Sequence, residues 1–415
     1  MLMGLYTVLM LGTTWYMDQP LYDGWSPYTF AVPGLAYSVF VILLALLPAI
    51  YLPRTFHRPS QVILWWLYPV SYVPVVTLHG FVIPGQYPAF ALTVALTFYL
   101  LTVSYALPTV NVRNHLSLRV FWRLLLLGTL GLLGILFAVF GRSLTLTGDI
   151  YAVRETFQTR IRSFGPVFFR VISYGITWLE NTFTPLLVAG TLASLTAPWM
   201  AGVGVVAMLT VFAIGGFKSA FFAVGMAVAL YIALHDDGRY LPTYAVLAGP
   251  VALIVLVFFD RLGAPSQLLG LGRRTLITPG FMTAYHVEFF SQNPHTLWAD
   301  RTWIGLPYPY DLPVANLIGR EILGRPGQVA NAPFWGSGYA AAGTIGMIVE
   351  GLLLTGVLYL LDCAAADLPK RFAGATVAGL LTGLAYSSAI NVILLGGLGV
   401  LIGLFFLHPP IDDVT

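Results

Sequence analysis

The chain is divided into apolar stretches whose lengths approach what a helix needs to cross a membrane. A helix requires roughly 20 apolar residues to span the hydrocarbon core of a bilayer. Because lipid cannot satisfy backbone polar groups, such stretches predict an all-α polytopic membrane protein of about twelve transmembrane helices, with residues 1–415 forming one integral membrane domain. The predicted spans are 1–14, 34–52, 62–82, 88–107, 119–140, 183–197, 199–214, 218–235, 241–259, 335–361, 372–388 and 390–407.

Composition supports the membrane class and excludes several others. Hydrophobic residues make up 58% of the chain and charged residues 9%, far from the balance of water-soluble domains. The single cysteine, Cys363, excludes an intramolecular disulfide and cysteine-based zinc or redox motifs. A net charge of +3 does not suggest nucleic acid. The sequence also lacks an Asp-x-Asp motif, a metal-spaced His/Cys cluster and a glycine-rich nucleotide loop, so neither a metal nor a cofactor is expected.

Two predicted helices need separate comment. The first apolar stretch lacks a basic start and an Ala-x-Ala-like site, which favours a retained helix over a cleaved signal. Residues 166–182 contain Arg170, Trp178, Glu180 and Asn181, which predicts a helix lying in the membrane interface.

The distribution of basic residues predicts the orientation. If the spans alternate, the opposite short loops 15–33, 83–87 and 215–217 contain no Lys or Arg. The positive-inside tendency then places both termini in the cytoplasm and the long loops 141–169 and 260–334 outside. The short loops on the predicted cytoplasmic side carry Arg54, Arg58, Arg113, Arg119, Arg239, Lys370 and Arg371.

Arginine dominates the basic residues, and many arginines lie in the two predicted outer loops. Of the 20 basic residues only Lys218 and Lys370 are lysines. Arginine's planar fork suits bidentate contact with phosphate, so an anionic ligand is expected, although a GC-rich genome or a thermophilic source would also favour arginine. The outer arginines are Arg142, Arg154, Arg160 and Arg162 in loop 141–169, and Arg261, Arg273, Arg274, Arg301, Arg320 and Arg325 in loop 260–334.

The arginine pair Arg273 and Arg274 is the main candidate for an anion site. Two adjacent guanidinium groups in a chain with little charge predict a clamp on a diphosphate. The alternative is that the pair forms ion pairs with Asp300 or Asp311, or anchors to lipid headgroups.

The residues after this pair predict a short helix with candidate catalytic groups. Pro279-Gly280 is expected to begin the helix and to leave N–H groups facing an anion. Tyr285 and Glu288 lie one turn apart and share a face, whereas His286 points elsewhere. Glu288 is a candidate general base for a sugar hydroxyl, with an ordinary surface glutamate as the alternative.

Three further features have both a functional and a structural interpretation. Lys218, in the joint 215–219 between two helices, either binds a ligand or extends to lipid headgroups. Glu350 lies within a predicted span, where a structural hydrogen bond to a neighbouring helix is favoured over catalysis. Trp298, Trp303, Tyr308 and Tyr310 either stack on sugar rings or form an interfacial belt.

Taken together, these features resemble the Wzy-type O-antigen and oligosaccharide repeat-unit polymerases. The resemblance rests on about twelve spans, two arginine-rich outer loops, and Arg273-Arg274 followed by Pro-Gly, Tyr and Phe-Phe. The glycine-rich run 331–346 and the turn ending in Lys218-Ser219 are also similar to that family. O-antigen ligases share the architecture but carry a histidine where this chain has Ala332 and Pro333, which favours a polymerase.

The resemblance implies a fold, a reaction and partners. The fold would be that of polyprenyl-diphosphate-dependent membrane glycosyltransferases (GT-C-like) in the bacterial inner membrane. The donor and the acceptor would both be glycans linked to undecaprenyl diphosphate, with membrane lipids and a chain-length regulator as further partners. Catalytic candidates are Glu288, Tyr285 and His286, and substrate-binding candidates are Arg273, Arg274, Arg154, Arg160, Arg162, Lys218 and Arg301.

Two other functions stay open at this point. A transferase that uses a polyprenyl-monophosphate sugar would need an acidic residue in the first outer loop, where Asp18 and Asp23 lie. A lipid-linked oligosaccharide flippase would use the same cationic residues without forming a glycosidic bond.

Overall fold

The structure is a computed structural model, and it describes residues 2–17, 30–83, 85, 87–110, 116–141, 150–262, 272–300 and 305–411. These residues are helical or lie in turns and connections, without a β-strand among them, which confirms the predicted all-α class. In this part of the chain five helices are long and apolar enough to cross a membrane: Pro59–Val82, Pro88–Ala106, Leu118–Phe140, Leu241–Phe259 and Phe334–Ala364.

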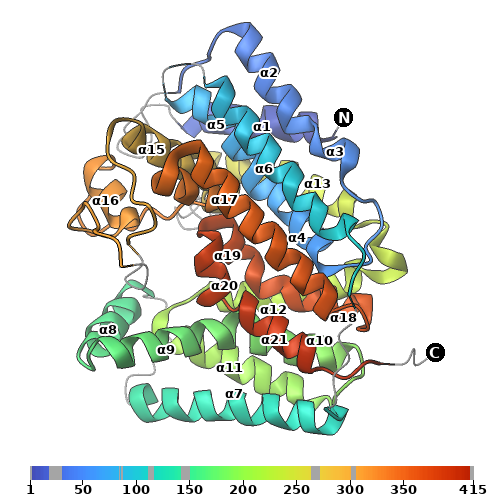
Figure 1. Cartoon of the computed structure of the whole chain (residues 1–415). Helices are drawn as coiled ribbons and strands as arrows, with labels where there is room; N and C mark the ends of the chain where they lie inside the picture. The colour runs from blue at the N-terminus through green and yellow to red at the C-terminus, as the bar shows by residue number, and fades with distance from the viewer. Residues whose placement is uncertain are drawn as a thin grey trace.

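The helices follow one another with few long connections (Figure 1). The first part contains α1 (Leu2–Met17), α2 (Leu35–Leu46), α3 (Pro48–Tyr51), α4 (Pro59–Leu67), η2 (Tyr68–Tyr72), α5 (Val73–Val82), α6 (Pro88–Ala106), α7 (Leu118–Phe140) and α8 (Ile150–Arg162). The middle part contains α9 (Pro166–Trp178), η4 (Leu179–Phe183), α10 (Thr184–Leu192), α11 (Trp199–Gly215), α12 (Ser219–Ala233), η5 (His235–Gly238), α13 (Leu241–Arg261), α15 (Thr278–Gln292) and α16 (Val314–Glu321). The last part contains α17 (Phe334–Ala364), α18 (Lys370–Thr376), η6 (Val377–Gly379), α19 (Leu380–Tyr386), α20 (Ala389–Leu394) and α21 (Leu398–Leu407).

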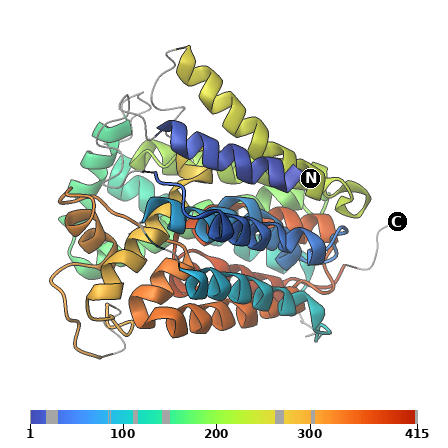
Figure 2. The same cartoon turned by 90° about the horizontal axis from the view of Figure 1, so that it is seen from above.

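The short basic connections meet at one end of the molecule, which we call the basic end (residues 52–58, 107–110, 231–239 and 365–371). The Phe56 amide donates to the Asp237 carbonyl over 2.8 Å, and the Lys370 ammonium lies 3.1 Å from the Asp237 carboxylate. Arg58 donates to the Leu107 carbonyl over 2.7 Å. The start of α1 and the end of α21 lie on this side (Figures 1 and 2).

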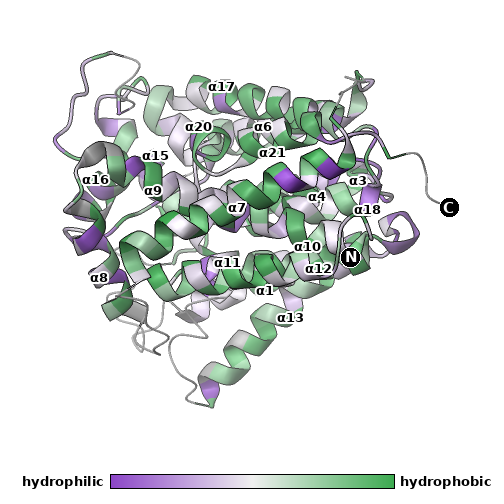
Figure 3. Ribbon diagram, turned by 90° about the horizontal axis from the view of Figure 1, so that it is seen from below, coloured by the Kyte–Doolittle hydropathy of each residue, from purple (hydrophilic) through white to green (hydrophobic). Residues whose placement is uncertain are grey.

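Helices α8, α15 and α16 lie at the opposite end, which we call the loop end (Figure 1). The described helices of the expected long loops 141–169 and 260–334 therefore lie at the same end. Hydrophobic residues extend along most helices between the two ends, and hydrophilic residues are visible on α8 and α16 (Figure 3).

The predicted boundary between an interfacial helix 166–182 and a span 183–197 is wrong. Residues 166–192 form one continuous helical run, in which η4 is a π-helical turn that joins α9 to α10. Two of the polar residues that suggested an interfacial helix, Glu180 and Asn181, are buried inside the protein, while Arg170 is exposed. The Asn181 amide donates to the Gly396 carbonyl over 3.0 Å, and the Thr182 hydroxyl donates to the Gly397 carbonyl over 3.1 Å.

Helix α17 is interrupted near its start. Ala342 and Gly343 have non-helical backbone angles, and Gly343 has a φ of 62°. In an unbroken helix residues eight positions apart would be about 12 Å apart. Here a Cβ built on Gly338 would lie 2.6 Å from the Gly346 carbonyl oxygen, so the chain reverses and two helical segments pack against each other. Residues 334–341 therefore run antiparallel to the first turns of residues 344–364, which then continue to the basic end.

Candidate functional site

The arginine pair lies in a short helical turn, residues 272–276, directly before α15. The Arg273 side chain is half-buried and the Arg274 side chain is exposed. Burial, together with the charge of Arg325, lowers the pKa of the Arg273 guanidinium to about 10, while Tyr285 acts in the opposite direction. At neutral pH Arg273 is therefore a partly desolvated cation that lies close to a second cation.

The sequence analysis identified Arg325 as one of the outer arginines but did not place it beside Arg273. It follows α16, far along the chain from the pair, and no local spacing indicates that the two groups meet. The Arg274 carbonyl accepts a hydrogen bond from the Tyr386 hydroxyl at the end of α19, which fixes the turn against that helix. Two guanidinium groups held near each other are stabilised by an anion that binds both.

Pro279 lies in the first turn of α15, as predicted, but the role expected for the exposed N–H groups is wrong. The Gly280 and Phe281 amides both donate to the Ile277 carbonyl, so they are used within the turn. A Cβ on Gly280 would lie 2.5 Å from the Pro74 carbonyl oxygen. The glycine is therefore required for close packing of α15 on α5.

The three candidate catalytic residues of α15 have different surroundings. Tyr285 is buried at 2% exposure and lies near Arg273. His286 is also 2% exposed, its Nδ1 lies 2.7 Å from the Met282 carbonyl oxygen, and burial lowers the pKa of this imidazole to about 4. These contacts give His286 a packing role in its own helix, because a substrate hydroxyl cannot reach an enclosed ring.

Glu288 is the half-buried member of this group, and its charge faces Tyr87 in the connection between α5 and α6. Burial raises the pKa of the Tyr87 hydroxyl, and the Glu288 carboxylate raises it further. A carboxylate that is partly accessible and close to a phenol can accept a proton from a bound hydroxyl. Of the three predicted catalytic residues, Glu288 has the geometry best suited to that role.

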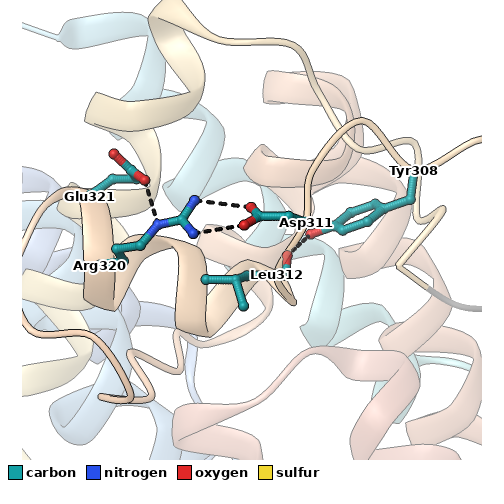
Figure 4. Close-up of polar contacts among 5 residues, drawn as sticks. All are labelled: Tyr308, Asp311, Leu312, Arg320 and Glu321. Carbon is teal, nitrogen blue, oxygen red and sulfur yellow. Dashed lines mark hydrogen bonds and ion pairs between the residues drawn. The ribbon is translucent and has the colours of Figure 1, made fainter.

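An ion pair between Arg320 and Asp311 lies in the second half of loop 260–334. It bears on one alternative for Arg273 and Arg274, namely an ion pair with Asp311. Arg320 donates to both Asp311 oxygens over 2.8 and 3.0 Å and to Glu321 over 2.7 Å (Figure 4). Both oxygens of the Asp311 carboxylate thus accept hydrogen bonds from Arg320, not from Arg273 or Arg274. Arg320 lowers the pKa of the Asp311 carboxyl through this hydrogen bond.

The aromatic residues of the loop contact other rings and backbone groups. Tyr308 donates to the Leu312 carbonyl over 2.6 Å (Figure 4), and its ring lies 5.8 Å from that of Tyr310. Tyr310 packs on Phe290 of α15 with ring centroids 5.9 Å apart. Trp303 and Arg301 lie outside the described residues.

The basic residues of the first loop belong to a different packing layer. The Arg154 guanidinium lies 5.6 Å from the centre of the Phe217 ring, in the predicted joint between α11 and α12. Lys218 in that joint is exposed, and Arg160 is half-buried. Helix α8 packs on α9 and α11, whereas α15 packs on α5 and α17. The side chain of Arg162 lies outside the described part of the chain.

Glu350 is fully buried and accepts hydrogen bonds from three different segments. The Ser337 hydroxyl donates to it over 2.9 Å and the Trp298 indole over 3.2 Å, both at Oε1. The Ala389 amide at the start of α20 donates to Oε2 over 2.9 Å. The predicted structural hydrogen bond to a neighbouring helix is confirmed, while the contact with Trp298 was not predicted.

The described residues contain no group of three or more His, Cys, Asp or Glu side chains that could hold a metal ion. Comparisons of the chain with protein-family models, with curated proteins and with solved structures give no match.

Proposed function

We propose that this protein is a membrane glycosyltransferase that polymerises oligosaccharide repeat units carried on undecaprenyl diphosphate. The observation that carries the proposal is the approach of Arg273 and Arg325 next to the buried start of α15. A half-buried cation beside an exposed one favours a ligand with two or more negative charges, and a lipid diphosphate offers these at the membrane surface. An oligosaccharide on such a carrier is already activated.

In the proposed reaction the bond between the anomeric carbon and the diphosphate oxygen breaks, and an acceptor hydroxyl oxygen bonds to that carbon. The electron pair of the broken bond goes to the diphosphate, where Arg273 and Arg325 stabilise the added charge. The proton of the acceptor hydroxyl goes to Glu288. Neither a nucleotide nor a metal ion has a step in this scheme.

The proposal includes a topology. We infer that the helical runs cross the membrane twelve times, as the hydropathy predicts, with the basic end in the cytoplasm and the loop end outside. The basic residues at the first of these ends include Arg54, Arg58, Arg239 and Lys370. The resemblance to repeat-unit polymerases supports a location in the bacterial inner membrane.

The test is to give the protein, purified in detergent with EDTA, a lipid-linked repeat unit. A ladder of longer lipid-linked products is expected. Replacing Arg273 or Arg325 with alanine should lower the rate about ten- to a hundredfold, the value of a hydrogen bond to a charged group. Arg273→Lys should recover little of the loss, because the bidentate geometry is absent. The matched control is Arg239→Ala, which removes an exposed arginine at the basic end and should leave the rate unchanged.

Other outcomes would identify the alternatives. Strict dependence on a divalent cation would favour the monophosphate-sugar transferase built on Asp18 or Asp23, which lie outside the described residues. Lipid translocation without new glycosidic bonds would favour the flippase. Transfer of the glycan to a different lipid acceptor in a single step would favour a ligase.

A further inference from the structure

Residues 296 and 297, which follow α15, are hydrogen-bonded to residues 340 and 341, directly before the break in α17. The Thr296 amide donates to the Ala340 carbonyl over 3.0 Å, and the Leu297 amide donates to the Ala341 carbonyl over 2.9 Å. Leu297 and Trp298 both have left-handed backbone angles, with φ of 49° and 57°. Consecutive non-glycine residues adopt this conformation only where the surrounding contacts impose it.

The contact that can impose it is the bond from the Trp298 indole to Glu350. The indole and the Ala389 amide can only donate, so both oxygens of the Glu350 side chain act as acceptors. A carboxylate satisfies this arrangement, and an amide cannot, because one of its two ends is itself a donor. The Ser337 hydroxyl shares the oxygen that binds Trp298.

We propose that Glu350 is a positioning residue, which holds the outer segment (residues 293–300 and 305–333) against the membrane helices through Trp298. Its carboxylate lies on the second segment of α17, Ser337 lies on the first, and Ala389 lies on α20, so the acceptor is fixed from three sides. A side chain fixed in this way can hold a strained loop, because moving it breaks several bonds at once.

Contacts within the outer segment connect this attachment to Arg325. The Tyr310 hydroxyl donates to the Pro294 carbonyl, which joins the second half of the segment to the first. Arg320 then binds Asp311, and the Arg325 amide donates to the Gly319 carbonyl over 2.9 Å. Glu350 therefore sets the place of Arg325 relative to Arg273, and this last consequence rests on the proposed function.

The attachment is tested by hydrogen exchange of the purified full-length protein. The readout is the amide exchange of residues 296–299, since two of these amides donate to α17 and the Ala299 amide donates to the Thr296 carbonyl. Glu350→Gln keeps the shape and removes one acceptor, and Trp298→Phe keeps an aromatic ring and removes the N–H. Either variant should exchange about ten- to a hundredfold faster at these residues.

Two controls match the chemistry of these changes without touching the attachment. Glu155→Gln alters an exposed carboxyl of α8, and Trp199→Phe alters an indole that is 57% exposed at the start of α11. Both should leave exchange at residues 296–299 unchanged. The double variant Glu350→Gln with Trp298→Phe should exchange no faster than the faster single variant, because both changes break one bond.

A second measurement separates this inference from the proposed function. Inorganic pyrophosphate should slow the exchange of residues 272–276 in the parent, and about ten times more of it should be needed in Glu350→Gln. If pyrophosphate has no effect on any form, the diphosphate site is refuted while the attachment stands on the exchange of residues 296–299. Parent-like exchange there in both single variants, or additive effects in the double variant, would refute the attachment.

Discussion

The reversal in α17 makes a sharp prediction for the glycines that permit it. A Cβ on Gly346 would overlap the Gly338 carbonyl oxygen, and the reciprocal Cβ on Gly338 would lie 2.6 Å from the Gly346 carbonyl oxygen. Non-bonded heavy atoms settle at about 3.5 Å. Gly346→Ala should therefore push the two segments of α17 apart by about an ångström, since the obstruction is backbone and cannot rotate away.

The expected loss of stability follows from two opposing effects. Inserting a methyl group into a packed interior costs about 1 to 3 kcal/mol, and a clash with backbone lies toward the upper value. Alanine in place of glycine within a helix returns about 1 kcal/mol. The net destabilisation should be about 2 kcal/mol.

The assay is unfolding of the purified protein by SDS in mixed micelles, with the midpoint compared between variants. Gly356→Ala is the matched control, because it lies in the same helix and nothing lies within 4 Å of its added Cβ. That variant should be up to about 1 kcal/mol more stable than the parent. If Gly346→Ala and Gly356→Ala unfold at the same midpoint, the antiparallel packing of the two segments is refuted.

Two further predictions concern titratable groups at the loop end. The pKa of His286 is about 4 in the folded protein and 6.5 in its ordinary state, so on acidification the unfolded chain binds a proton first. The free energy of unfolding should therefore fall by about 3 kcal/mol as the pH drops from 6.5 to 4. His286→Gln should flatten this dependence in thermal unfolding scans, and an unchanged pH profile would contradict the burial of the ring. Arg320 lowers the pKa of Asp311, so acid should release this pair and lower the amide protection factors of residues 311–325 in the parent. Asp311→Asn should lower the same protection factors at neutral pH. Exchange in Asp311→Asn that matches the parent at neutral pH would show that the ion pair does not order this region.

Hydropathy alone predicted those helices whose residues are mostly apolar. The predicted spans 119–140, 199–214 and 241–259 match α7, α11 and α13 closely, because each is a long, mostly apolar stretch. The joint between α11 and α12 was also predictable, since Gly216 adopts the left-handed conformation that ends a helix there. These features depend only on neighbours along the chain.

The features that hydropathy missed depend on contacts between distant residues. The polar residues Glu180 and Asn181 suggested an interface, but they are buried in a π-helical turn whose partners include the backbone near Gly396. The reversal at Gly343 and the approach of Arg325 to Arg273 likewise have no local pattern. A hydropathy window averages over such positions, and a spacing rule compares only residues that are close in sequence.

The two charged centres of the loop end illustrate different ways to place charge beside hydrocarbon. Glu350 is enclosed and accepts hydrogen bonds from indole, hydroxyl and amide donors, so its environment stabilises it without a ligand. Arg273 is only half-buried and has another arginine as a near neighbour, an arrangement whose energy falls when an anion enters. The first centre is suited to holding structure and the second to binding. The outer segment contacts Glu350 through Trp298 and carries Arg325, so a change at Glu350 should alter the anion binding that we propose for Arg273 and Arg325.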